Sequence, residues 1–124
     1  MTHSGVIAIS RELTEKERTL VERLLRSGVA DVSAFLPQLL HLRVASRCSC
    51  GCPTVDFGVS GRSAAVTGES TILGEGGGVS PEGVRFAIIL HGREGLISEL
   101  EVYPLESDAS FTLPEIDQIE IYDG

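Results

Sequence analysis

The sequence contains no tryptophan, and aromatic residues make up only 5% of its 124 residues. The hydrophobic core must therefore consist mainly of valine, isoleucine, leucine and alanine. No apolar run approaches the roughly 20 residues that a membrane-spanning helix needs. Residues 1–10 lack both the basic region and the long apolar region of a signal peptide. These absences predict a cytoplasmic protein that does not enter the membrane.

The sequence also lacks internal repeats and any segment with the composition of a linker. Its length lies within the usual range of one domain, and at this size a folded chain buries roughly two-thirds of its unfolded surface. The apolar content of 42% and the charged content of 23% are typical of globular proteins. We therefore expect a single domain over residues 1–124.

Basic residues are absent from the C-terminal part of the chain. From Glu94 onward there are nine acidic residues and no lysine or arginine, whereas residues 1–47 hold seven basic and five acidic residues. The formal net charge of −8 argues against binding to nucleic acid or to anionic membranes. The acidic C-terminal end is either a solvated rim or a surface that attracts a basic partner.

The N-terminal half is predicted to be helical. Thr14 and Glu17 have the spacing of a capping box, in which each side chain binds the backbone amide of the other residue. Helical spacing of apolar residues follows, and Gly28 is typical of a helix end; the apolar positions are Leu20, Val21, Leu24 and Leu25. A second, shorter helix is expected from Asp31 or Ser33 through Leu36, where Pro37 either kinks it or begins a new turn.

The rest of the chain has the patterns of a sheet. Alternating or strongly apolar stretches predict four strands, at residues 42–50, 54–59, 84–91 and 96–103, and residues 92–95 predict a hairpin loop between the last two. Residues 5–10 and 119–122 are weaker strand candidates. The glycine- and serine-rich residues 60–83 read as a long surface loop, with one short strand at 64–67 as an option. The predicted fold is α+β, with an N-terminal helical pair packed on an antiparallel sheet of about four strands.

The last of these four strands alternates two kinds of side chain. One predicted face carries Leu96, Ser98, Leu100 and Val102, and the other carries Ile97, Glu99, Glu101 and Tyr103. The two glutamates are then either solvated groups on an outer face or an acid/base pair.

Three cysteines lie within five residues, in the sequence RCSCGCP of residues 47–53. An odd number of cysteines at this spacing is not a disulfide framework, so reduced thiols are expected. In an extended chain Cys48 and Cys50 share one face about 7 Å apart, and a bend at Gly51 can bring Cys52 toward them. Such thiolates can hold zinc or copper(I), with His41, His91 or Asp56 as the fourth ligand.

Two other interpretations of the cysteines compete with a metal site. The chain lacks the C-x2-C pair of common structural zinc sites. Arg43 and Arg47 are candidate cations for a reactive thiol, although both lie on the opposite face of a regular strand. Cysteine is also often a small buried side chain. We favour packing and expect no cofactor, with zinc or copper bound by Cys48, Cys50 and Cys52 as the alternative.

Three segments together resemble a group of small uncharacterised bacterial proteins. These are LTEKER at residues 13–18, RCSCGCPTVD at residues 47–56 and GLISELE at residues 95–101. The cysteine motif is the distinctive part, and the three segments extend over most of the chain. The resemblance implies a bacterial protein, but it implies no activity and assigns no functional residue.

No catalytic motif is legible in the sequence, because it contains no G-x-S-x-G elbow, H-E-x-x-H pair or Walker loop. We therefore expect a non-enzymatic, immunity- or adaptor-like binding module of the bacterial cytoplasm. Its partner would be another protein or a second copy of the chain, and neither nucleic acid nor membrane. The alternative is a metal-binding or thiol-redox protein that uses Cys48, Cys50 and Cys52.

Overall fold

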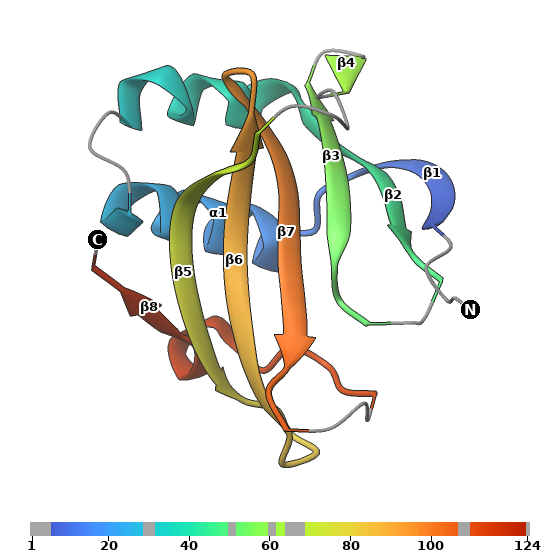
Figure 1. Cartoon of the computed structure of the whole chain (residues 1–124), viewed down its shortest axis with the longest axis vertical. Helices are drawn as coiled ribbons and strands as arrows, with labels where there is room; N and C mark the ends of the chain where they lie inside the picture. The colour runs from blue at the N-terminus through green and yellow to red at the C-terminus, as the bar shows by residue number, and fades with distance from the viewer. Residues whose placement is uncertain are drawn as a thin grey trace.

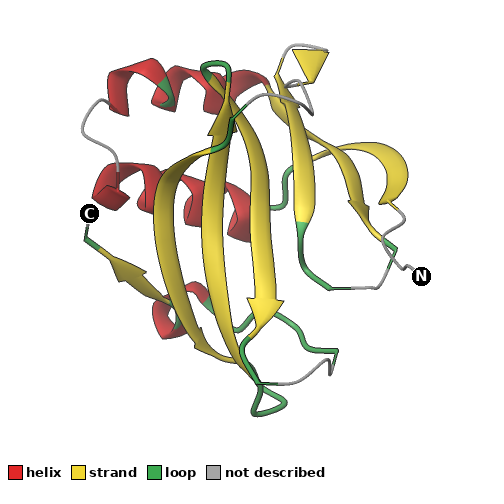
Figure 2. Cartoon of the chain, in the orientation of Figure 1, coloured by secondary structure: helices red, strands yellow, loops and turns green. Residues whose placement is uncertain are grey.

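An antiparallel sheet and one α-helix pack as two layers in the computed structural model (Figure 1). The structure describes residues 6–28, 32–49, 52–59, 62–63, 69–106 and 110–123. Figure 2 shows the helical segments on one side of the sheet, and in the described part of the chain no helix lies over the other side. The α+β class expected from the sequence is confirmed.

The sheet has more strands than the sequence predicted. Its order is β1-β2-β3-β7-β6-β5-β8, with β4 paired only to β3. The strands are β1 Val6–Glu12, β2 Leu42–Cys48, β3 Val55–Val59, β4 Arg62–Ser63, β5 Thr71–Val79, β6 Arg85–Arg93, β7 Leu96–Pro104 and β8 Glu120–Tyr122. The expected count of about four strands is wrong, because β1, β5 and β8 extend the sheet beyond the four strands that the pattern predicted.

The helix α1 spans Glu15–Gly28, as the capping box and the glycine predicted. The Thr14 amide donates to the Glu17 carboxylate at 2.9 Å, and the Glu17 amide donates to the Thr14 hydroxyl at 3.1 Å. Arg11 of β1 donates two further bonds to the same carboxylate, at 2.8 and 2.9 Å. Burial alone would raise the pKa of Glu17, but these hydrogen bonds hold it below its ordinary value.

The predicted N-terminal helical pair is wrong, because no single second helix follows α1 in the described residues. In its place are two 3₁₀ helices, η1 at Val32–Ala34 and η2 at Leu36–His41. Pro37 is in the first turn of η2, where its missing amide is tolerated, but it prevents an α-helix from running through this point. Leu39 of η2 is buried, and its carbonyl accepts a hydrogen bond from Arg18 of α1 at 2.6 Å.

The glycine-rich segment expected to be a loop contains the nine-residue strand β5. A Cβ atom at Gly74 would lie 2.5 Å from the Leu24 carbonyl oxygen, and one at Gly28 would lie 2.3 Å from the Leu73 carbonyl oxygen. The end of α1 therefore packs on β5 backbone against backbone, and side chains at these glycines would prevent it. The optional strand at residues 64–67 lies outside the described residues.

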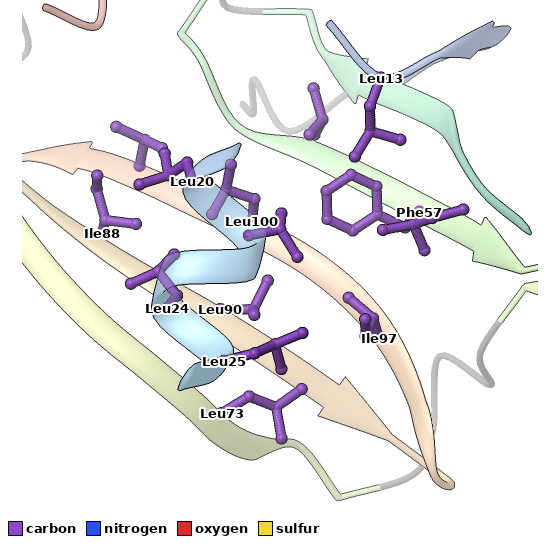
Figure 3. Close-up of a cluster of buried hydrophobic side chains, with 14 of the residues drawn as sticks. Leu13, Leu20, Leu24, Leu25, Phe57, Leu73, Ile88, Leu90, Ile97 and Leu100 are labelled. Carbon is purple, nitrogen blue, oxygen red and sulfur yellow. The ribbon is translucent and has the colours of Figure 1, made fainter. Parts of the chain in front are cut away.

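The core lies between α1 and the covered face of the sheet (Figure 3). Four apolar residues of the helix meet apolar residues from five strands, all of them fully or almost fully buried. The central residues are Leu20, Val21, Leu24 and Leu25 of α1 with Val44, Phe57, Leu73, Phe86, Ile88, Leu90, Ile97, Leu100 and Val102 of the sheet. Phe111 stacks on Phe86 with ring centroids 5.5 Å apart, which fixes the chain after β7.

Register shifts in four strand pairs change which face some side chains occupy. In β7 the register shifts between the pairs His91↔Glu99 and Gly92↔Ile97, so Ile97 is buried in the core. The strict alternation had placed Ile97 on the face of the glutamates. In β2 the register shifts after Val44, and Ser46 lies on the uncovered face opposite Asp56. Each bulge inserts one residue, and the side chains beyond it change face.

The strands β3 and β7 join two halves of the sheet along a short seam. The seam consists of the register pairs Val55↔Leu100 and Asp56↔Glu99. Next to the seam, at the residue before β3, the Thr54 hydroxyl donates to the Val102 carbonyl at 3.0 Å and accepts from the Val102 amide at 2.8 Å. These side-chain bonds continue the strand pairing where the backbones separate.

At the other end of the seam, the side chain of Gln38 from η2 binds the edge of β7. The Gln38 amide group donates to the Gly95 carbonyl at 2.7 Å, and its oxygen accepts from the Ile97 amide at 2.8 Å. Gly95 and Glu94 form the predicted hairpin turn, with φ angles of 78° and 53° that suit a two-residue turn.

Among the described residues, no helix combines the length and apolar character needed to cross a membrane.

Candidate functional site

The uncovered face of the sheet is built from rows of side chains that cross neighbouring strands. Register pairing between β2, β3, β5, β6, β7 and β8 defines three rows. The first row is Ser46, Asp56, Glu99, His91 and Ile72; the second is Glu101, Ile89, Glu75 and Tyr122; the third is Tyr103, Ala87, Gly77 and Glu120. We name these residues the acidic face, which is directed toward the viewer in Figure 1.

Negative charge dominates this surface. Five of its side chains are carboxylates, and they come from β3, β5, β7 and β8: Asp56, Glu75, Glu99, Glu101 and Glu120. Within the three rows the one basic side chain is His91, and Arg85 and Arg93 lie on the same face at the two ends of β6. Tyr103, Tyr122 and Ile72 are 36%, 47% and 51% exposed, so large apolar groups lie among the charges.

Glu99 lies at the centre of the first row, between Asp56 and His91. Burial raises its pKa above the ordinary value, and the like charge of Asp56 raises it further, while His91 acts in the opposite direction. A carboxylate directly opposite another carboxylate in neighbouring strands is destabilising. A cation placed over Glu99 and Asp56 would remove this repulsion.

His91 takes part in a chain of hydrogen bonds across the same face. Its Nδ1 is 2.7 Å from the Ser70 hydroxyl, and its Nε2 is 2.9 Å from a carboxylate oxygen of Glu101. Serine, histidine and carboxylate in this order have the connectivity of an activated nucleophile.

The charges around this chain argue against nucleophilic catalysis. Attack by Ser70 on a carbonyl or phosphoryl group would develop negative charge, which catalytic sites stabilise with hydrogen-bond donors or cations. Here the neighbouring groups are Glu99 and Glu101. The arrangement suits the binding of a cation better than the stabilisation of an anion.

Cys48 and Cys52 lie beside the first row, since Cys48 is two residues beyond Ser46 in β2 and Cys52 shortly precedes β3. Cys48 ends the strand, and both cysteines are half-buried and not joined in a disulfide. Cys50 lies outside the described residues, so a shared site of all three thiols stays a prediction. Among the described residues, no group of three or more His, Cys, Asp or Glu side chains is arranged to hold a metal ion.

The candidate fourth ligands have other positions or partners. His41 precedes β2, so it lies at the opposite end of the strand from Cys48, about 20 Å away at the usual rise of a strand. Asp56 accepts a hydrogen bond from Ser46 at 2.8 Å, and the His91 ring is hydrogen-bonded to Ser70 and Glu101.

The sequence identified only part of the acidic face. The placement of Glu99 and Glu101 on one outer face is confirmed. Asp56, Glu75 and Glu120 were not grouped with them, because strand pairing brings them together from distant parts of the chain. The chain matches no protein-family model, no curated protein and no solved structure. Proposals about its function therefore rest on the geometry of its own residues.

Proposed function

We propose that this protein is a non-enzymatic binding module of the bacterial cytoplasm, immunity- or adaptor-like, that binds a basic protein partner on its acidic face. The observation that carries the proposal is the gathering of five carboxylates from four strands on one uncovered face of the sheet. A surface of one sign attracts a partner of the opposite sign and accelerates the encounter.

Two further features of the face support a protein partner. Tyr103 and Tyr122 are exposed beside the carboxylates, and tyrosine is enriched in protein interfaces, where it offers apolar area and a polar tip. Glu99 and Asp56 repel each other across the seam, so an arginine or lysine bound over them would relieve an existing cost.

Capture of partners by two charge-matched variants tests the proposal. Glu75→Lys with Glu120→Lys reverses two exposed charges on the acidic face. Glu15→Lys with Asp117→Lys makes the same change in net charge at exposed positions near α1. The expected result is that the wild type and the second variant retain one basic protein from native lysate, identified by mass spectrometry, and that the first variant loses it.

Three results would count against the proposal. The captured protein could be acidic, or it could bind the acidic-face variant as well as the wild type. The wild type could also capture no partner and remain monomeric by light scattering, which would remove self-association as well. Melting curves of both variants control for misfolding.

A further inference from the structure

One edge of the sheet is left partly unpaired next to the acidic face. Within the described residues β8 pairs with Glu75, Gly76 and Gly77 of β5 only, although β5 begins at Thr71. The outer edge of residues 71–74 therefore has no strand partner in the described part of the chain, although Gly28 at the end of α1 lies against the backbone of Leu73 and Gly74. Unpaired strand edges present backbone amides and carbonyls that can accept an added strand.

A cavity of about 230 Å³ opens at this edge. Its lining comes from the end of α1, from β5 and from the end of β8: Gly28, Ile72, Gly74, Glu75, Tyr122 and Asp123. Two of these residues are glycines that bring the helix and strand backbones together, so part of the wall is backbone. Ile72 and Tyr122 are about half-exposed and flank the opening.

The charges at the cavity favour a cation. Glu75 and Asp123 contribute carboxylates to its lining. Gly28 is the last residue of the 14-residue helix α1, and the C-terminus of a helix carries a partial negative charge from its aligned peptide dipoles. The helix end and the two carboxylates therefore both attract a positive charge to the cavity.

We infer that the outer edge of β5 at Thr71–Gly74 accepts an extended basic segment of a partner protein as an added strand, with one lysine or arginine side chain in the cavity. Backbone pairing supplies affinity in this mode of recognition, and pockets for individual side chains supply specificity. The inference rests on the proposed function, because it specifies how the basic partner binds beside the acidic face.

Three synthetic octapeptides test the inference with the full chain labelled with ¹⁵N. The first alternates valine and lysine, the second alternates valine and glutamate, and the third is the fully N-methylated form of the first. N-methylation keeps the charges and side chains but removes every backbone donor. We expect the lysine peptide to shift the amide signals of residues 71–74, the N-methylated form to bind at least about tenfold more weakly, and the glutamate peptide not to bind.

Two variants of β5 provide a matched pair. Ile72 and Val79 lie on the same face of the strand and are 51% and 53% exposed, but only Ile72 lines the cavity. Ile72→Lys should weaken binding of the lysine peptide about tenfold by like-charge repulsion, and Val79→Lys should change it less than about twofold.

Equal binding of the N-methylated peptide, or equal loss in both variants, would overturn the added strand while leaving the acidic face as a binding surface. Absence of lysine-peptide binding at millimolar concentration would overturn the inference as well. The proposed function is decided separately, by capture with the Glu75/Glu120 variant.

Discussion

The two halves of the sheet differ in how they are held together. In the C-terminal half, β5, β6 and β7 are nine-residue strands paired over nearly their whole lengths. In the N-terminal half, β2 and β3 are shorter, with seven and five residues, while register shifts occur in the ladders of both halves. Within the described residues the strand pairing between the halves is limited to the seam, next to which Thr54 and Gln38 bind the edge of β7 with their side chains.

Backbone pairing thus runs along most of each half, whereas between the halves it is short and is supplemented by side-chain hydrogen bonds. This division also explains the charge pattern of the first row, because Asp56 belongs to one half and Glu99 to the other. A substitution at the seam should therefore weaken the connection between the two halves while leaving the strand pairing within each half intact. Three variants test this comparison.

The largest effect is expected from Gly74→Ala in the C-terminal half. Its Cβ would lie 2.5 Å from the Leu24 carbonyl oxygen, which belongs to a helix backbone and cannot move aside without shifting α1. Overpacking of this kind should lower the free energy of unfolding by about 3 kcal/mol, measured by urea denaturation. Ile72→Ala, at an exposed position of the same strand, should change it by less than about 0.5 kcal/mol. A loss below about 1 kcal/mol for Gly74→Ala would contradict the close contact.

A smaller effect is expected from Thr54→Val at the seam. This change keeps the shape of the side chain but leaves the amide and the carbonyl of Val102 without their hydroxyl partner. The expected loss is about 1–3 kcal/mol, together with faster hydrogen exchange of the Val102 amide. Thr112→Val, which removes a hydroxyl bond to Glu82 at an exposed site, is the control and should cost less. Unchanged exchange at Val102 would show that the seam does not depend on this side chain.

The smallest effect, of opposite sign, is expected from Glu99→Gln. Glu99 has a folded-state pKa above its ordinary value of 4.5, so the folded chain binds this proton more tightly than the unfolded chain. The ionised side chain therefore destabilises the fold above the raised pKa, and the penalty disappears below the unfolded value. Glu99→Gln should raise the free energy of unfolding by about 0.2–1 kcal/mol at pH 7 and by nothing measurable near pH 3.5.

Glu101→Gln is the matched control for this pH dependence, because Glu101 is the hydrogen-bond partner of His91. It should not stabilise the protein. Equal stabilisation by both variants would indicate general relief of negative charge and not the pairing of Glu99 with Asp56 across the seam.

Local signals in the sequence predicted the parts of the fold that depend on local contacts. The capping box of Thr14 and Glu17 and the glycine at position 28 gave the bounds of α1 to within one residue. Apolar runs on both sides of Glu94 and Gly95 predicted the strands β6 and β7, and these two residues form the turn between them. These elements carry their own start and stop signals.

The missed parts depend on contacts between distant segments. Four glycines made β5 look like a loop, but Gly74 contacts α1, and a Cβ atom at Gly76 would lie 2.4 Å from the Glu120 carbonyl oxygen of β8. The bulge in β7 moved Ile97 to the other face, which no pattern of alternation reveals. For the same reason the acidic face could be predicted only at Glu99 and Glu101, which are neighbours in one strand.

The contact between Gly28 and β5 has a consequence for how this fold can vary. Two backbones that touch at Gly28 and Gly74 leave no space for a side chain at either position, whatever the surrounding residues are. The two glycines are 46 residues apart in the sequence, yet the same backbone contact requires both of them. Homologous chains that keep this packing should therefore retain both glycines together, even where the strands and the charged surface have diverged beyond recognition.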